Sequence, residues 1–402
     1  MNRYLSPRTL GVIAVTLALS FLVACAAAPT PTPAPPPTKA PTEPAKPAAA
    51  ATPVPAPATP VPAATKPAAA APKPTQAAKA APAATVKLSV DPVGKSSDAG
   101  LYIALEKGYF KEQNITIELK PVAGTAERLQ MLAIGEADVG GGSPGPGIYN
   151  AILRGIPLKL AAEKGSNPPG QGFISFVIRK DLFDQGAIKD PKDLKGRKIG
   201  ITGANAGATA LIDLDILMSK AGLTYKDTEP VDMVFADFGA AFAGKSIDVA
   251  AQIEPLTTKG VEQGLFVRWK GIDEINPNHQ VAALMFSSQF AKDRADVAKR
   301  FMVAYVKGVR DYNDAFVKKD RKARDEVIPV LIKHTDIKQQ ELFDKMVFPG
   351  LNPDGHVNTQ SLSRDLEWLL ANGFMRQAVD LKEIIDNQFA DYAVQVLGPY
   401  KK

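Results

Sequence analysis

The sequence is poor in the side chains that most enzymes use for chemistry. It contains one cysteine and three histidines among 402 residues. The histidines, His279, His334 and His356, are far apart, and neither HExxH nor CxxC spacing occurs. A single cysteine cannot form a disulfide within the chain, and the common zinc sites need one of these spacings. We therefore expect neither a metal centre nor a cofactor.

The globular part has no excess of either charge. Residues 1–85 hold seven Lys or Arg against one acid, which accounts for the net charge of +6. Residues 86–402 hold 41 bases and 41 acids. A nucleic-acid-binding domain presents a basic surface to the phosphates. Nucleic acid is therefore not expected as a partner.

The N-terminus has the pattern of an export signal. Arg3 and Arg8 precede an uncharged apolar run from Thr9 to Ala24, which is too short for a comfortable membrane span. The next residue is Cys25, and LVAC matches the bacterial lipobox, in which the thiol receives diacylglycerol. We interpret residues 1–24 as a lipoprotein signal peptide and Cys25 as the lipidation site. The alternative is an ordinary signal peptide, which leaves the lone cysteine without a role.

A Pro/Ala-rich segment follows the cysteine. Residues 26–85 hold 18 prolines, no glycine and no aromatic residue, and their only large apolar side chains are Val54 and Val61. Such a composition cannot form a core, and it favours extended polyproline II at about 3.1 Å per residue. We predict that residues 25–85 are the lipidated cysteine and a disordered stalk that holds a domain clear of the membrane. A recognition segment for an SH3-like partner is the alternative.

From Val86 onward, short β-rich runs alternate with helical ones, which is typical of α/β proteins. The 317 residues from Val86 to Lys402 exceed the roughly 250–300 at which single cores stop growing, so two lobes are expected. Strands are predicted at 86–90, 115–119, 137–139, 158–162, 173–178, 198–201, 233–236, 248–253, 265–269 and 280–286. Helices are predicted at 99–113, 125–134, 148–153 and 206–221, and the rest, from Lys292 to Tyr400, is mostly helical with breaks at Pro329, Pro349 and Pro353.

Two of these strands are expected to cross between the lobes, namely 173–178 and 280–286. Lobe 1 would then comprise 86–178 with 280–402, and lobe 2 would comprise 179–279. Closure would bend the chain at Phe176–Lys180 and His279–Ala283. A cleft between the lobes would be lined by the loops at which open α/β sheets bind ligands.

Two nucleotide-binding motifs match only formally. Gly239–Ser246 fits the P-loop pattern, but its AAFA favours a helix and no helix follows Lys245, so we interpret it as a helix that ends at Gly244. Gly140–Gly145 fits the dinucleotide pattern, with Glu163 in the place of the ribose-binding acid. The prolines in and after that loop lack the N–H donors that a pyrophosphate needs. Cleft lining by this loop is the better interpretation.

The globular part resembles a known family from about Val86 to Tyr400. The segments that carry the resemblance are, in order, YIALEKGYFKEQNITIEL, IGEADVGGGSP, ILRGIPLKLAA, DLKGRKIGITGANAGA, AGKSIDVAAQIEP and RFMVAYVKGVRDY. They are similar to the extracytoplasmic substrate-binding proteins of ABC importers, in the nitrate, sulfonate, taurine and thiamine-precursor class. The resemblance implies a two-lobed α/β fold of the periplasmic-binding-protein type II, with two crossover strands and a helical C-terminal part.

The resemblance also implies which residues hold the ligand. They come from the loop after the first strand, from the Gly-Ser-Pro loop, from the start of a helix in the second lobe, and from an acid before a proline. In this sequence they are Ser96, Ser97 and Asp98, Gly142 and Ser143, Asn205, Ala206 and Gly207, and Glu254.

These loops contain few groups that would select a ligand. Lys95 is the only candidate cation, so an oxyanion would rest on backbone N–H groups, hydroxyls and the N-terminus of the Asn205 helix. Phe173, Phe238 and Trp269 could clamp a pyrimidine. Relatives that make a thiamine precursor enzymatically carry a cysteine-rich motif, and its absence here counts against enzymatic activity.

We therefore expect a solute-binding component of an ABC importer, lipid-anchored outside the cytoplasm at the cell surface or in the periplasm. Its ligand would be a small polar or anionic molecule such as a sulfonate, nitrate, taurine or a pyrimidine. Its partners would be the permease and ATPase subunits, and the chain itself would be a monomer. Two alternatives remain open at this point. One is a stalked extracellular enzyme with Glu254 as base and His279 as acid, and the other is a sensory co-receptor of the same fold.

Overall fold

The computed structural model describes residues 81–92 and 94–401. The predicted signal peptide, Cys25 and nearly all of the predicted stalk lie outside these residues. Among the helices that are described, none is long and apolar enough to cross a membrane.

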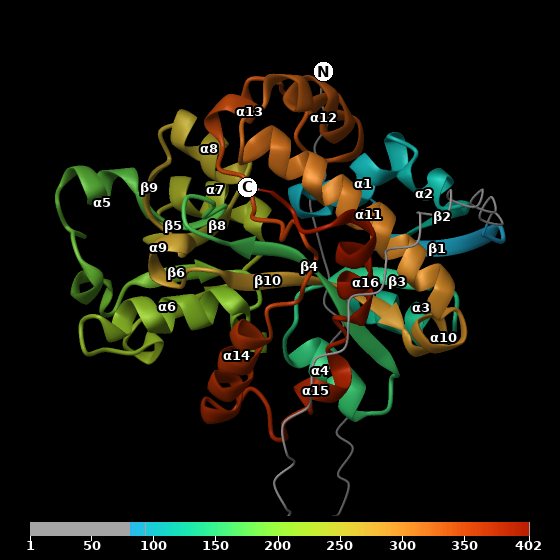
Figure 1. Cartoon of the computed structure of the whole chain (residues 1–402). Helices are drawn as coiled ribbons and strands as arrows, with labels where there is room; N and C mark the ends of the chain where they lie inside the picture. Colours follow the sequence, from blue (N-terminus) through green and yellow to red (C-terminus); the bar gives the residue numbers. More distant parts are fainter. Residues whose placement is uncertain (1–80, 93, 402) are drawn as a thin grey trace, which may run out of the picture. The chain divides into compact units, whose positions relative to one another are not determined.

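The first of two five-stranded sheets has the order β2-β1-β3-β10-β4 (Figure 1). Strand β10 is antiparallel to both of its neighbours, and the other pairs are parallel. We call this sheet and the helices that cover it lobe 1. The strands are β1 (Ala84–Val90), β2 (Ile115–Pro121), β3 (Val139–Gly142), β4 (Leu158–Asn167) and β10 (His279–Ser287).

The second sheet has the order β7-β6-β8-β5-β9 and belongs to lobe 2. Strand β5 is antiparallel to β8 and β9, whereas β6 is parallel to β7 and β8. The strands are β5 (Ile174–Arg179), β6 (Lys198–Ile201), β7 (Glu229–Asp232), β8 (Val249–Ile253) and β9 (Phe266–Gly271).

Helices surround both sheets. Those of lobe 1 are α1 (Ala99–Glu106), α2 (Tyr109–Glu112), α3 (Thr125–Ala133), α4 (Pro146–Leu153), α10 (Ser288–Asp293), α11 (Ala295–Phe316), α12 (Arg321–His334), α13 (Leu342–Lys345), α14 (Thr359–Ala371), α15 (Leu381–Ile384) and α16 (Gln388–Leu397). Those of lobe 2 are α5 (Lys180–Asp184), α6 (Thr209–Ser219), α7 (Phe238–Ala243), α8 (Leu256–Glu262) and α9 (Ile272–Ile275). The 3₁₀ turns are η1 (Ser96–Asp98), η2 (Pro191–Leu194), η3 (Ala204–Ala206), η4 (Tyr225–Asp227) and η5 (Phe235–Asp237).

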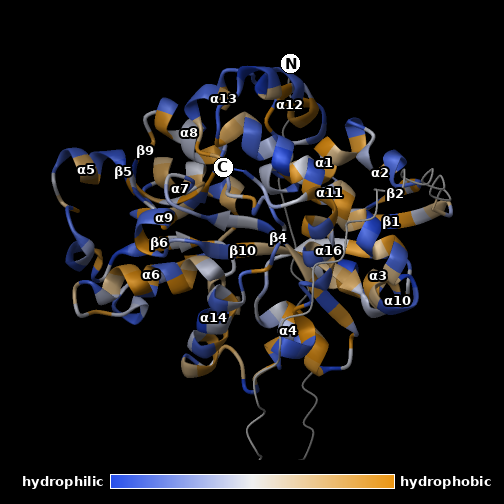
Figure 2. Ribbon diagram, in the orientation of Figure 1, coloured by the Kyte–Doolittle hydropathy of each residue, from blue (hydrophilic) through white to orange (hydrophobic). Residues whose placement is uncertain are grey.

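The first sheet is buried on both faces. On β10, Leu284 and Phe286 pack into the core under α1 and α11, whereas Ala283 and Met285 pack into the core under α3, α4 and α14. Successive residues of a strand point to opposite faces, so a strand covered on both sides needs a continuous apolar run. The sequence of β10 has such a run, and Figure 2 shows hydrophobic residues along β1 and on the helices around it.

The connections between the sheets differ from those predicted. The strand expected to cross first corresponds to β5, which is paired on both sides within the second sheet. The connection is therefore 168–173, not 173–178, and the second connection is 272–278, which ends where β10 begins. The bends expected at Phe176–Lys180 and His279–Ala283 fall mainly in paired strands, whose hydrogen bonds resist bending.

Four further predictions about secondary structure are wrong in detail. The helix predicted at 99–113 is divided at Gly108, which has a φ of 78°. The helix predicted from Ala206 begins at Thr209, because Gly203 and Gly207 are both left-handed around η3. A strand was predicted at 233–236, but the strand β7 lies four residues earlier. There it pairs with β6 along its whole length. Pro329 lies within α12 on its exposed side, where water can bond the carbonyl that the proline leaves free.

The motif that fits the P-loop pattern forms a helix that ends at Gly244, as expected from its sequence. Residues 238–243 form α7, which ends at Gly244, and Lys245 pairs with Asp181 at 3.2 Å. No helix follows that lysine, because β8 begins at Val249. The P-loop is therefore excluded.

A buried histidine joins both lobes at the start of β10. His279 has no exposed surface. Its Nδ1 lies 2.8 Å from Oδ1 of Asp213 on α6, and its Nε2 lies 3.1 Å from Oδ2 of Asp365 on α14. The side chain of Asn276 donates to the same oxygen of Asp213 at 3.0 Å. We call His279, Asp213 and Asp365 the histidine cluster.

The two carboxylates determine the charge of this histidine. Burial by itself would lower the pKa of His279, but Asp213 and Asp365 outweigh it and raise the pKa from its ordinary value of 6.5 to about 10. The ring is thus an imidazolium at neutral pH. It supplies one positive charge between two acids that would otherwise be buried without a counter-charge.

We expect His279→Gln to lower the free energy of unfolding by about 3–5 kcal/mol, because it leaves buried carboxylates unpaired. The matched control is His356→Gln, which removes an exposed pair with Asp391 and should cost at most about 1 kcal/mol. Urea denaturation of both variants measures the difference. Equal losses would show that the histidine cluster does not stabilise the fold.

The same cluster predicts a pH dependence. Because the pKa of His279 is raised in the folded state, its contribution to stability is complete below about 6.5 and is lost as the pH rises through about 10. The difference in unfolding free energy between wild type and His279→Gln should therefore shrink from pH 6 to pH 10. Groups that titrate in both proteins cancel in this difference. A difference that is constant or grows with pH would contradict the assignment.

Candidate functional site

The topology brings the carboxyl edges of the two sheets toward each other. Strands β1, β3 and β4 all end at one edge of the first sheet, and β6, β7, β8 and β9 all end at one edge of the second. Both connections, 168–173 and 272–278, run between these two edges. The connections also touch, because the N–H of Gly170 donates to Asp273 at 2.8 Å. The loops after the strands therefore line the space between the lobes, where α/β proteins bind ligands.

The loop after β1 forms the centre of the lobe 1 wall. Asp98 is buried in η1 and pairs with Nζ of Lys164 at 2.7 Å. The same ammonium group donates to Oγ of Ser97 at 3.2 Å. The backbone N–H of Lys95 donates to the other carboxylate oxygen of Asp98 at 2.9 Å. Of the predicted site residues, Ser97 and Asp98 are thus held together, and Ser96 is buried beside them.

The glycine run on β3 makes room for two buried cations. A Cβ on Gly141 would lie 2.7 Å from Cε of Lys164, and a Cβ on Gly140 would lie 2.9 Å from Cδ of Arg128. Adjacent strand residues face opposite sides, so the two cations flank β3 from its two faces. The close approach explains why neither position carries a side chain.

Arg128 is almost fully hydrogen-bonded within lobe 1. Its guanidinium donates to Oγ of Ser89 at 3.1 Å, to Oδ1 of Asp91 at 2.7 Å, and to the carbonyls of Gly141 and Val122 at 3.1 and 3.2 Å. This arginine therefore orders the loops after β1, β2 and β3.

Lys95 is the only cation expected at the site from the sequence, whereas Arg128 and Lys164 are not expected there. Lys95 itself points away, to Asp336 at 3.6 Å. The missed residues lie on a helix and inside a strand, not in the loops that were searched. Lys164 could have been found from its position within the apolar run LKLAAEKG, because a lysine in a buried strand needs an acidic partner.

Gly142 and Ser143 end β3 at the same edge. A Cβ on Gly142 would lie 3.1 Å from Ile148 and from Met285, so this glycine packs against the core. Ser143 is exposed. Its hydroxyl is available to a ligand.

The predicted donors of lobe 2 are already engaged. Asp232, at the end of β7, accepts the N–H of Gly203 at 2.9 Å and the N–H of Asn205 at 3.2 Å. Asn205 and Ala206 are exposed in η3. Gly207 packs against α14, because a Cβ there would lie 2.8 Å from Leu369.

Glu254 connects lobe 2 to the segment after α13. Its carboxylate accepts the N–H of Thr258 at 3.0 Å and the N–H of Val347 at 3.3 Å, and it lies 3.4 Å from Arg268. Burial raises the pKa of Glu254, against the effect of these donors and of Arg268. This acid is thus occupied by protein groups.

The aromatic residues proposed as a clamp are mainly core residues. Phe173 and Phe238 are buried in the two cores of lobe 2, and Trp269 packs against one of them. His279, proposed as an acid, is buried in the histidine cluster and makes no hydrogen bond or ion pair with Glu254. The structure therefore does not bring together the pair that the enzyme alternative requires.

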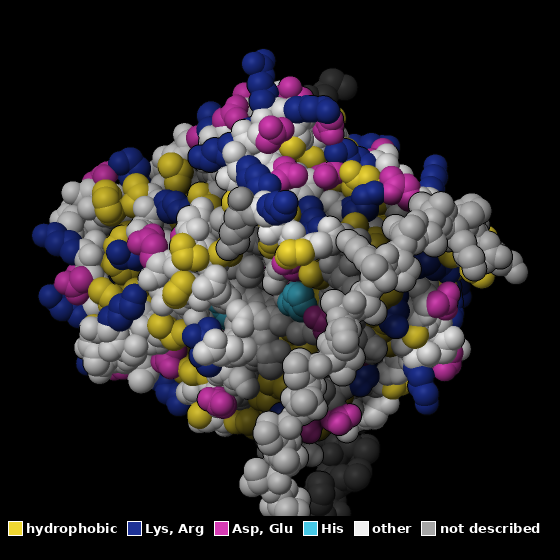
Figure 3. Space-filling view, viewed as in Figure 1, with side chains coloured by type: hydrophobic (Ala, Val, Ile, Leu, Met, Phe, Trp, Pro, Cys, Tyr) yellow, Lys and Arg dark blue, Asp and Glu magenta, His cyan; other side chains and the backbone are white. Residues whose placement is uncertain are grey.

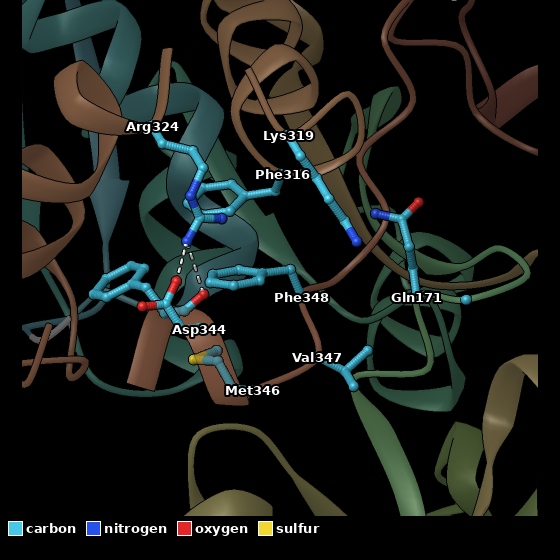
Figure 4. Close-up of a pocket in the computed structure, with 10 residues that line it drawn as sticks. Gln171, Phe316, Lys319, Arg324, Asp344, Met346, Val347 and Phe348 are labelled. Atoms are coloured by element: carbon cyan, nitrogen blue, oxygen red, sulfur yellow. Dashed lines mark hydrogen bonds and ion pairs between the residues drawn. The ribbon is translucent and has the colours of Figure 1, made fainter. Parts of the chain in front are cut away.

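A separate cavity of about 460 Å³ lies between the first connection and helices α11 to α13. Figure 4 shows Arg324 paired with Asp344 beside the rings of Phe316 and Phe348, which stack at 4.0 Å. Lys319 and Gln171 lie at its other end. None of the predicted site residues lines this cavity. Across the residues that the structure describes, no cluster of His, Cys, Asp or Glu is arranged to hold a metal ion.

The family model described as NMT1/THI5 like matches residues 95–314, which is more than half of the chain. A Brucella abortus protein, provisionally named a binding protein, is 25% identical over 294 residues, or 72% of this chain and 86% of that protein. The formylaminopyrimidine-binding protein of Halalkalibacterium halodurans is 22% identical over 313 residues, covering 73% and 87%. A Haemophilus influenzae protein, provisionally assigned to thiamine biosynthesis, is 27% identical over 150 residues, covering 37% of this chain and 43% of that protein.

Two solved structures show the same fold. The periplasmic nitrate-binding protein NrtA from Synechocystis PCC 6803 matches with a TM-score of 0.61 and 14% identity, covering 79% of this chain and 89% of that one. The alkanesulfonate-binding protein SsuA from Xanthomonas axonopodis pv. citri, bound to MOPS, matches with 0.58 and 15%, covering 77% and 100%. The expected fold is thereby confirmed as the two-lobed α/β type II fold of periplasmic binding proteins, and the chain belongs to the NMT1/THI5-like family.

Proposed function

We propose that the chain is the solute-binding component of an ABC importer, which captures a small polar molecule between the carboxyl edges of its two sheets. The observation that carries this proposal is the cluster of Lys164, Asp98 and Ser97 at the edge that faces lobe 2. The names of the relatives support it, because they bind formylaminopyrimidine, nitrate or alkanesulfonate. The site residues predicted from the sequence remain proposals.

Capture would proceed by closure of lobe 2 onto lobe 1. The hinges would be 168–173 and 272–278, which are connected through Asp273. The contact between lobe 2 and α14 is buried and includes the histidine cluster. The contact with the α13 side is polar and partly exposed, through Glu254 with Val347 and Lys345 with Glu262. We expect the α14 side to act as the pivot and the α13 side to change on closure.

The remaining parts of the proposal concern location and partners. A lipid on Cys25 and the stalk up to residue 85 would tether the domain outside the cytoplasm. The permease and ATPase subunits would be its partners, and the chain would act as a monomer. A sensory co-receptor would share the binding site and differ only in its partner, so permease and ATPase genes beside this one would favour uptake.

The binding function predicts that the protein retains or recognises a small molecule. Native mass spectrometry of the Cys25→Ala chain should show a bound adduct, or a screen of small polar compounds should give one clear rise in melting temperature. A ligand at 100 times its Kd adds about 2.7 kcal/mol of stability. Small-angle scattering of that complex should show a smaller radius of gyration than the free protein. Turnover of the compound, or binding without compaction, would contradict the proposal.

The lipid anchor predicts a different outcome in cells. The wild-type protein should be in the membrane fraction and should incorporate a clickable fatty acid, because diacylglycerol would be attached to its only cysteine. Cys25→Ser should be released and unlabelled. Membrane retention of Cys25→Ser would show that another segment anchors the chain.

A further inference from the structure

Four cations near the two carboxyl edges are paired with carboxylates of the chain itself. Each has an acidic partner at 2.7–3.6 Å. The pairs are Lys95 with Asp336, Arg128 with Asp91, Lys164 with Asp98, and Arg268 with Glu254. Figure 3 likewise shows acidic and basic side chains interspersed over the visible face. These four cations therefore offer no surplus positive charge to an anion.

Lys164 is the cation best placed to meet a ligand, and it is neutralised most closely. Its ammonium group lies 2.7 Å from Asp98, and both side chains are only 8% exposed. An anion that approached Lys164 would come almost as close to the carboxylate, so the two Coulomb terms would nearly cancel. Asp98 cannot turn away easily, because its other oxygen holds the N–H of Lys95.

The backbone donors of lobe 2 are occupied in the same way. The N–H groups of Gly203 and Asn205 point at one centre, as in a nest that binds an oxyanion. The carboxylate of Asp232 fills that centre, at 2.9 and 3.2 Å. A nitrate or sulfonate would have to displace an acid that is tied to the adjacent strand, and it would then lie beside that acid.

Two nearby groups do not alter this balance. Burial raises the pKa of Glu163, next to Lys164 in β4, to about 8, so it is mainly uncharged at neutral pH. Lys319 lies on the turn between α11 and α12, at the separate cavity in Figure 4. None of the paired groups described above lines that cavity.

We propose that Asp98 and Asp232 act as built-in anions. Their carboxylates occupy the hydrogen-bond donors that an oxyanion would need, and the site therefore selects a ligand without net charge. Such a ligand is a neutral heterocycle or a zwitterion, and nitrate-like or sulfonate-like anions are excluded. This inference rests on the proposed function for the location of the site. The inference adds to the proposed function the net charge of the small polar molecule that the site accepts.

The test compares anions and uncharged counterparts on the Cys25→Ala chain and on variants made in it. The probes are nitrate and ethanesulfonate, and then taurine and cytosine, with chloride at equal ionic strength as the reference. The parent chain should show no rise in melting temperature with either anion. Asp232→Asn removes the charge and one of the two acceptor oxygens, so the N–H of Gly203 or of Asn205 is freed. This variant should gain binding of nitrate or ethanesulfonate, seen as a rise of about 2 °C or more. A shift with cytosine or with taurine would identify the heterocycle or the zwitterion.

Matched variants separate this effect from a general change in charge. Asp237→Asn removes an exposed acid from η5 at the same edge and should not gain anion binding. Asp98→Asn should gain it, and adding Lys164→Met to that variant should abolish the gain. If Asp98→Asn does not fold, Asp232→Asn still decides the question, because Asp232 is exposed.

Two results would overturn the inference. One is binding of nitrate or ethanesulfonate by the parent chain. The other is a failure of both Asp232→Asn and Asp98→Asn to gain such binding, because the acids would then not be what excludes anions. Neither result requires the natural ligand to be known. Failure of the proposed function would instead be seen as turnover of the compound or as binding without compaction.

Discussion

The fold depends on one buried charge. His279 lies where the second connection enters β10, and it holds α6 of lobe 2 and α14 of the C-terminal part through two carboxylates. The imidazolium could not remain protonated in this buried position without the two carboxylates, and it is the counter-charge that they contact. The three groups therefore specify one another. They fix the place from which lobe 2 can rotate, together with the hydrogen bond from Nε1 of Trp368 on α14 to Asp215 on α6 at 2.7 Å.

A second constraint acts at the edge of the first sheet. Gly140 and Gly141 carry no side chains because Arg128 and Lys164 occupy the space on the two faces of β3. The arginine orders the loops after β1, β2 and β3, and the lysine holds η1 through Asp98. The strands of the first sheet thus end in loops that side-chain hydrogen bonds and ion pairs already hold in place. Less loop entropy is then lost when a ligand binds.

Much of the architecture could be predicted from the sequence, and the site could be predicted only in part. Most strands follow from local apolar runs, which depend on near neighbours. The place of β10 inside the first sheet, where a crossing strand was expected, follows only from its pairing with β3 and β4. The place of β7 was missed because its four residues are defined by pairing with β6, which periodicity does not record. The partner of Lys164 was missed because Asp98 is distant in sequence. The loops around Ser97 and Asn205 were found, but the acids that fill their donors are visible only in three dimensions.

The charge of the bound molecule is separable from the fold. Strand ends and short 3₁₀ turns supply backbone N–H groups in any chain of this architecture, since these groups are part of the main chain. What such donors bind depends on whether a side chain already occupies them, and in this chain Asp232 does so at η3. A single acid on the neighbouring strand therefore separates a site for an oxyanion from a site for a neutral molecule. Proteins of one fold can then differ in the charge of their ligand although their backbones are alike, because the difference lies in a side chain and not in the topology.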